Sequence, residues 1–132
     1  MKDMSISNKL FEKLLHHYWK AYEAGAPKAV SRFPKGYAIS YGDLIDIAAV
    51  PIDPRNAGGY LWDIAYYCDQ NGLPPLHALV VNKESGIPGD GFLTAPPHSQ
   101  EHPGDWSDWE VDIMKCIADV EKKLPRVAPL LR

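Results

Sequence analysis

The chain has 132 residues, of which 45% are hydrophobic and 23% are charged, and its formal net charge is −3 at pH 7. This length supports one domain with its own hydrophobic core, so we expect residues 1–132 to form a single domain. The net negative charge excludes a strongly basic nucleic-acid coat protein, although it leaves room for a local basic face.

The sequence also limits the environment of the protein. Two cysteines, Cys68 and Cys116, do not make a disulfide framework, and a reducing cytoplasm is their simplest location. The first residues lack the apolar core of a signal peptide, and no apolar run approaches the roughly 18 residues of a membrane span. We therefore expect a cytoplasmic protein that does not use a membrane.

The first predicted element is an amphipathic helix. Apolar residues recur at spacings of three and four from Leu10 to Tyr22, which is typical of a helix with one face against a core. Ser5 or Ser7 can cap its start. We favour packing on the core over binding in the groove of a partner. A polar, basic connector over residues 28–36 follows.

Two helices joined by a short turn are predicted next. Ser40 followed by Asp43 resembles a capping box that opens the first helix. Asp53 can cap the second helix, whose end is predicted at Asn71. Because residues 49–53 are the whole connection, the pair is typical of a helix-turn-helix.

A hairpin and a last helix complete the prediction. The aliphatic run from Leu76 to Val81 predicts a buried strand, and Ile87 to Phe92 predicts a second strand that runs back along it as a wing. Spaced apolar residues from Trp106 to Leu124 predict a C-terminal amphipathic helix. We expect an α+β fold, a winged helix-turn-helix with a short two-stranded hairpin and flanking N- and C-terminal helices.

One stretch resembles a known family. Phe33 to Leu44, F-P-K-G-Y-A-I-S-Y-G-D-L, is similar to the P-x-G-x-x-x-S/T-Y-G-D/E-L run of the DNA-binding domain of O6-alkylguanine-DNA alkyltransferases and alkyltransferase-like proteins. In that family a helix with the pattern R-x-x-G-x-x-L follows, which Arg55 to Leu61 matches. A Pro-rich turn, a strand and a Gly-containing wing come next, as they do here. The resemblance covers residues 33–92, an alkyltransferase-like winged-helix segment.

The resemblance implies DNA contacts. In the family the tyrosine of the Y-G-D motif rotates a DNA phosphate, and the arginine that opens the recognition helix fills the gap left by a flipped base. These roles would fall on Tyr41 and Arg55. Extruding a nucleotide costs a few kcal/mol, and a planar cation inserted into the stack recovers part of that cost. Asn56 and Gly58, on the same helix, are further candidate DNA contacts.

Electrostatic attraction would come from the basic connector. Lys28, Arg32 and Lys35 all lie in it. Since the net charge is negative, we expect weak and steeply salt-dependent DNA binding.

The departures from the family concern its chemistry. The nucleophilic cysteine is missing, and its place falls near His77, a degenerate active-site position. Without a thiolate at that strand there is no acceptor for an alkyl group, so we expect no alkyl transfer. We predict a non-enzymatic DNA-binding winged-helix protein with no catalytic residue, no cofactor and no metal.

Another motif could support chemistry. The stretch from His98 to His102 matches the H-x-x-E-H motif of inverted zinc proteases, but flanking prolines oppose the helix that this motif needs. A solvated loop is the default interpretation. An enzyme built around His77 or this loop stays a third, weaker hypothesis.

The alternative to DNA binding is a small protein-interaction module, an inhibitor or regulator. Seven Asp or Glu and no Lys or Arg occur from Glu84 to Asp112, whereas Lys9 to Lys35 contains six Lys or Arg and two Glu. Two solvated surfaces are the ordinary explanation. In the alternative hypothesis the same scaffold uses the acidic 84–112 surface against a protein partner. The oligomeric state is not predicted.

Each leading candidate also has an ordinary structural explanation. Arg55 can pair with Asp53 or Asp46 near the start of its helix, and Tyr41 can be a buried tyrosine whose hydroxyl has one partner. Trp106 and Trp109 could stack on bases, but at helical spacing they more often belong to a core.

Overall fold

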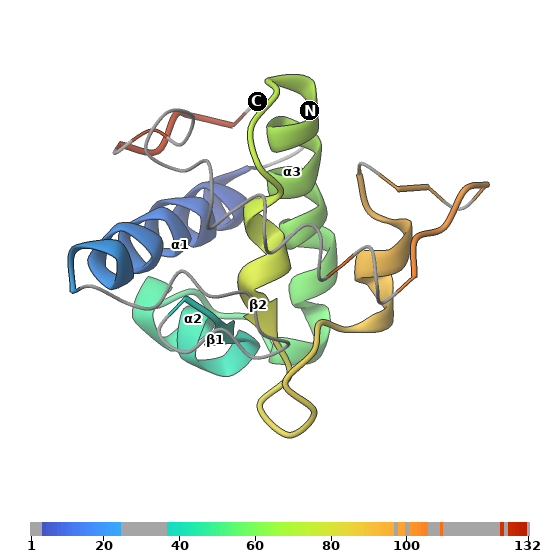
Figure 1. Cartoon of the computed structure of the whole chain (residues 1–132). Helices are drawn as coiled ribbons and strands as arrows, with labels where there is room; N and C mark the ends of the chain where they lie inside the picture. Colours follow the sequence, from blue (N-terminus) through green and yellow to red (C-terminus); the bar gives the residue numbers. More distant parts are fainter. Residues whose placement is uncertain are drawn as a thin grey trace.

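The computed structural model describes residues 4–24, 37–96, 98–99, 101–105, 109, 125 and 127–131. In these residues the fold is α+β, as predicted, with three α-helices, three 3-10 helices and one two-stranded sheet (Figure 1). The order is α1 (Ser5–Glu23), β1 (Ile39–Ser40), α2 (Tyr41–Ala48), η1 (Pro54–Asn56), α3 (Ala57–Gln70), η2 (Leu76–Leu79), β2 (Val80–Val81) and η3 (Asp90–Thr94). No helix in this part of the chain is long and apolar enough to cross a membrane.

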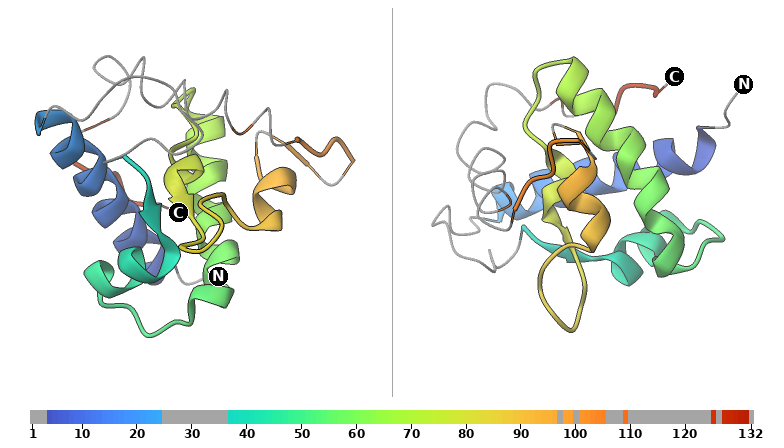
Figure 2. Two further views of the ribbon diagram at one scale, coloured as in Figure 1. Left: turned by 60° about the horizontal axis from the view of Figure 1, so that its bottom comes forward. Right: turned by 90° about the vertical axis from the view of Figure 1, so that its right-hand side faces the viewer.

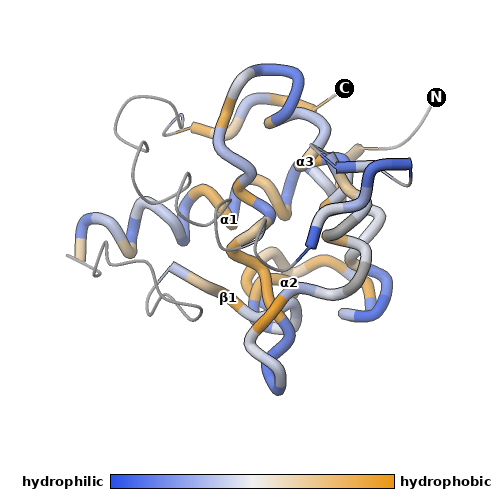
Figure 3. The backbone as a smooth tube through the Cα atoms, turned by 45° about the vertical axis from the view of Figure 1, so that its right-hand side comes forward, coloured by the Kyte–Doolittle hydropathy of each residue, from blue (hydrophilic) through white to orange (hydrophobic). Residues whose placement is uncertain are grey.

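Helix α1 carries a large part of the core. Its buried face includes Leu10, Phe11, Leu14 and Tyr18, each with no exposed surface. Figure 3 shows hydrophobic and hydrophilic residues alternating along α1, as in an amphipathic helix. The prediction that this face packs on the protein's own core is therefore confirmed.

The predicted cap of α1 is wrong. Met4 holds the N-cap position and makes no side-chain cap hydrogen bond. Ser7 is buried, and its hydroxyl donates to Oδ2 of Asp63 on α3 at 2.6 Å. The Ser7 hydroxyl, which the local sequence pattern assigned to capping α1, therefore forms a hydrogen bond with another helix instead.

Helices α2 and α3 begin where their local capping signals indicate. The Ser40 side chain accepts the Asp43 N–H at 3.1 Å, and the Asp53 side chain accepts the Arg55 N–H at 2.8 Å. The second cap opens the 3-10 turn η1, which continues into α3. Asn71 follows α3 as its C-cap, close to the predicted end.

The predicted hairpin is wrong in its pairing and in most of its strands. Strand β2 pairs in parallel with β1, with Ile39 opposite Val80. Only the last two residues of the first predicted strand form β2, its first four residues form the 3-10 helix η2, and no strand occurs in the described stretch from Ile87 to Phe92. Pro88 lacks the N–H that a ladder needs, and the neighbouring glycines weaken a strand.

Residues 82–87 form a closed loop instead of a hairpin. The Asn82 N–H donates to the Ile87 carbonyl, and the Gly86 N–H donates to the Asn82 carbonyl, both at 2.8 Å. Gly86 has φ 72°, which favours glycine. Figure 2 shows this loop projecting beyond the helices.

The predicted C-terminal helix, from Trp106 to Leu124, lies outside the described residues except for Trp109. Trp109 is fully buried, and its indole N–H donates to the Ala78 carbonyl at 2.8 Å. The core interpretation of Trp109 is therefore confirmed.

The end of α2 provides a test of the backbone conformation. Ala49 caps this helix with φ 54°, in the left-handed region that costs a non-glycine residue roughly 1–2 kcal/mol. We expect Ala49→Gly to raise the free energy of unfolding by about 0.5–1 kcal/mol, measured by urea denaturation. Ala48→Gly is the matched control, since Ala48 is the buried last residue of the helix and has a helical backbone, and it should lower that free energy by about 0.5–1 kcal/mol. Equal destabilisation by both changes would contradict the left-handed conformation of Ala49.

Candidate functional site

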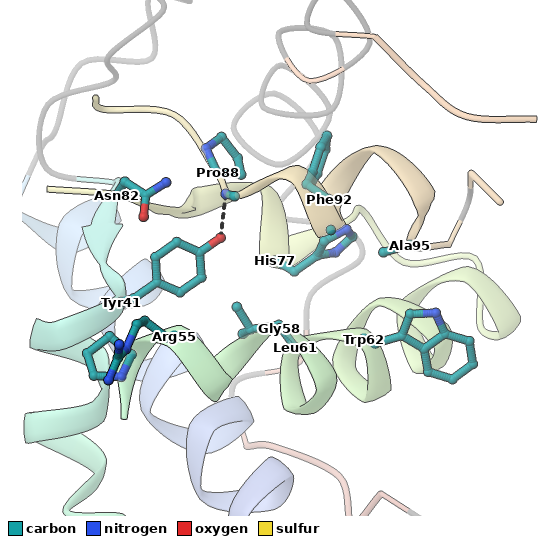
Figure 4. A pocket seen from close by; sticks show the side chains of 13 residues that line it. Tyr41, Arg55, Gly58, Leu61, Trp62, His77, Asn82, Pro88, Phe92 and Ala95 are labelled. Carbon is teal, nitrogen blue, oxygen red and sulfur yellow. Dashed lines mark hydrogen bonds between the residues drawn. The ribbon is translucent and has the colours of Figure 1, made fainter. Parts of the chain in front are cut away.

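One cavity brings together four of the eight sequence-predicted site residues. It has a volume of about 330 Å³ and lies between the start of α2, the start of α3 and the segment from η2 to η3 (Figure 4). Its lining includes Tyr41, Arg55, Gly58, His77 and Phe92. The predicted contacts, which are distant in the sequence, therefore meet in one place.

Tyr41, the first residue of α2, links the helix to the far wall of the cavity. Its hydroxyl accepts the Gly89 N–H at 2.8 Å, as the dashed line in Figure 4 marks. Burial raises the pKa of Tyr41, and the Gly89 hydrogen bond offsets part of that rise. The phenol is therefore neutral at physiological pH and keeps its own proton for donation. The prediction that the Tyr41 hydroxyl has one partner is confirmed, although the residue is only partly buried. Its contact with a DNA phosphate stays a prediction.

Arg55 lies at the rim of the cavity with 88% of its side chain exposed. Its Nε donates to Oδ1 of Asp53 at 3.1 Å and its Nη2 donates to Oδ2 at 3.3 Å. The hydrogen bond from this guanidinium is the main reason why the pKa of Asp53 is lowered. The predicted pairing with Asp53 is confirmed, and Asp46 is not the partner. Water screens an ion pair this exposed, so Arg55 can exchange the carboxylate for another acceptor.

Gly58 and Asn56 differ in their relation to the cavity. Gly58 lies on the first turn of α3 and lines the cavity, and a Cβ added there would meet nothing within 4 Å. Packing does not require a glycine at this position, and its small size leaves the helix surface open to a ligand. Asn56 is exposed at the N-cap of α3, makes no side-chain cap hydrogen bond and does not line the cavity.

His77 is the buried polar group of the cavity. It is only 4% exposed, and neither ring nitrogen has a hydrogen-bond partner among the described residues. Its ring packs against Phe92, with centroids 5.2 Å apart. Burial and, to a smaller extent, the nearby His98 together lower the pKa of His77 to about 3. The imidazole is therefore neutral, so one nitrogen can donate and the other can accept a hydrogen bond.

Other candidates lie away from this cavity or outside the described residues. Lys28, Arg32 and Lys35 belong to the second group. Cys68 is buried in α3 and does not line the cavity, and burial raises the pKa of its thiol to about 11. This thiol is protonated at neutral pH, so it does not replace the missing nucleophile.

Sequence reasoning missed two aromatic residues of the cavity. Phe92 was assigned to a strand, and Trp62 was not singled out, although both line the cavity. Trp62 precedes Tyr66 by one helical turn on α3, and this spacing was a signal for an aromatic surface. Among the described residues, no three His, Cys, Asp or Glu side chains could together hold a metal ion.

Comparison of the chain with models of known protein families, with characterised proteins and with solved structures finds no match. The function is therefore inferred from the geometry of the cavity.

Acid should destabilise the protein through His77. Its pKa is lower in the folded protein than the ordinary value of 6.5, so its contribution to stability is complete above about pH 6.5 and is lost as the pH falls toward 3. We expect wild type to lose about 2–3 kcal/mol more than His77→Gln between about pH 7 and pH 4.5 in urea denaturation.

His16→Gln is the matched control, because His16 is an exposed histidine of α1. This variant should follow the wild-type curve. A His77→Gln curve parallel to wild type would contradict a buried, neutral imidazole.

Proposed function

We propose that this chain is a non-enzymatic DNA-binding protein of alkyltransferase-like type, in which α2 and α3 act as a helix-turn-helix and the cavity receives a base extruded from the duplex. One observation carries the proposal: Tyr41, Arg55, Gly58 and His77 share one cavity. The closed loop 82–87 takes the place of the hairpin wing.

The cavity has the chemical groups that recognition of a single base requires. Proteins that extrude a base hold it by stacking and by hydrogen bonds to its edge. Phe92 offers an aromatic surface, and the neutral imidazole of His77 offers one donor and one acceptor. A volume of about 330 Å³ lies within the range of small-ligand sites.

The position of Arg55 fits the proposed insertion into the base stack. Its guanidinium is exposed at the rim, where, of the described side chains, only the exposed Asp53 carboxylate binds it. When a base enters the cavity, a planar cation at the rim can take the space that the base vacates. The exposed carboxylates of Asp43 and Asp46 on α2 repel phosphate, which agrees with weak, salt-dependent binding.

The lining of the cavity supports binding over group transfer. None of the described lining residues is a Cys, Ser, Thr, Lys, Asp or Glu, so the usual nucleophiles and carboxylate bases are missing from this set. The base would be held without a covalent step.

A duplex titration at low salt tests this function. We expect a labelled duplex with one mismatched pair to bind more tightly than the fully paired duplex, because a mismatched base costs less to extrude. Arg55→Ala should weaken binding to the mismatched duplex by about tenfold in fluorescence anisotropy. Tyr41→Phe keeps the ring but removes the Gly89 hydrogen bond, so it should weaken binding less.

Lys20→Ala is the matched control, since it removes one exposed cation of α1, away from the cavity. It should leave the preference for the mismatch unchanged. If Arg55→Ala and Lys20→Ala weaken binding equally, the attraction is charge alone and the proposed role of Arg55 is wrong.

A further inference from the structure

A second hollow, of about 500 Å³, lies on the outer flank of α3 and shares Trp62 with the cavity. Trp62, Tyr66 and Asp69 on α3 form one wall, and Thr94 and His98 contribute to the other. We call this surface the aromatic groove. The proposed DNA-binding function uses none of its residues except Trp62.

The two aromatic side chains of the groove are unusually accessible. Trp62 is 43% and Tyr66 48% exposed, and their rings stack with centroids 5.4 Å apart at an angle of 11°. Core packing therefore does not explain these side chains. Exposed aromatic surface of this kind is typical of binding sites.

The indole N–H groups of the described tryptophans support the same conclusion. Trp19 donates to the Pro125 carbonyl, and Trp109 donates to the Ala78 carbonyl. Trp62 makes no such hydrogen bond within the part of the chain that the structure describes. Its N–H is thus available to a carbonyl group of a bound molecule.

The charge around the groove is negative. Asp69 is exposed and forms no ion pair with the residues that the structure describes. No Lys or Arg is among the described residues that line the groove. The wall opposite α3 also belongs to the stretch from Glu84 to Asp112, which has seven acidic and no basic residues. This charge disfavours phosphate and favours a cation.

We propose that the aromatic groove binds an arginine-containing basic segment of a partner protein. A guanidinium attracts the face of an aromatic ring, Trp most strongly, and its planar shape suits stacking better than the ammonium of lysine. From that position it donates charge-assisted hydrogen bonds to Asp69. The Trp62 indole N–H donates to a carbonyl group of the bound backbone.

An NMR titration tests the groove on the whole chain. The probe is a short capped peptide with arginines among glycines and serines, and its matched control has citrulline, which is neutral and nearly isosteric, at each arginine. We expect the arginine peptide to shift the Trp62 indole N–H resonance saturably, and the citrulline peptide to leave it unmoved. Tyr66→Ala should weaken binding by about three- to tenfold, and Asp69→Asn by about two- to fivefold.

Glu84→Gln is the control for charge, because Glu84 is exposed, acidic and outside the groove. It should bind the peptide as wild type does. Equal weakening by Glu84→Gln and Asp69→Asn, equal binding of the citrulline peptide, or no shift with either peptide would each overturn the proposal.

A single-stranded oligonucleotide is the competing ligand, since bases also stack on exposed aromatic residues. If it moves the Trp62 resonance, the arginine peptide does not, and Tyr66→Ala abolishes that effect, the groove binds nucleic acid and the proposal is wrong. The outcome of this test is independent of the duplex titration, because Tyr66 and Asp69 do not line the cavity.

Discussion

The parallel pairing of β1 with β2 is the constraint on which the site depends. It places Ile39 opposite Val80, both of them buried, and so fixes the start of α2 beside the segment that follows η2. The Tyr41 hydroxyl then reaches the Gly89 N–H and closes the contact across the cavity. A sheet of two-residue strands is not stable alone, so core packing must hold these strands together. The shape of the cavity is therefore a consequence of the core.

Contacts with α1 favour one position of α3, whose residues also line the cavity. The buried hydrogen bond from Ser7 to Asp63 joins α1 to α3, and it is surrounded by the apolar face of α1. A buried carboxylate is costly unless it is hydrogen-bonded, so this contact favours one relative position of the two helices. Because α3 carries Gly58 and Trp62, that position also sets the walls of the cavity and of the aromatic groove.

The features that sequence reasoning predicted are local ones. The spacing of apolar residues in α1, the caps at Ser40 and Asp53, and the Arg55–Asp53 pair each depend on neighbours within a few residues. The pairing of β2 depends on a strand that precedes both α2 and α3, and nothing in the local pattern of residues 76–92 indicates it. The segment around His77 was expected to be buried, but the contact of His77 with Phe92 was not predicted because it follows from the tertiary fold.

The unsatisfied imidazole of His77 connects stability with function. Leaving a buried polar group without a partner costs about 1–3 kcal/mol, whereas a leucine at the same position would fill space at no such cost. A natural chain that keeps a polar ring there gives up stability, and such losses concentrate at functional sites. His77 lies on the wall of a cavity whose rim carries an exposed arginine. In the proposed function, a bound base that forms a hydrogen bond with this imidazole would recover part of the free energy that the unpaired ring costs.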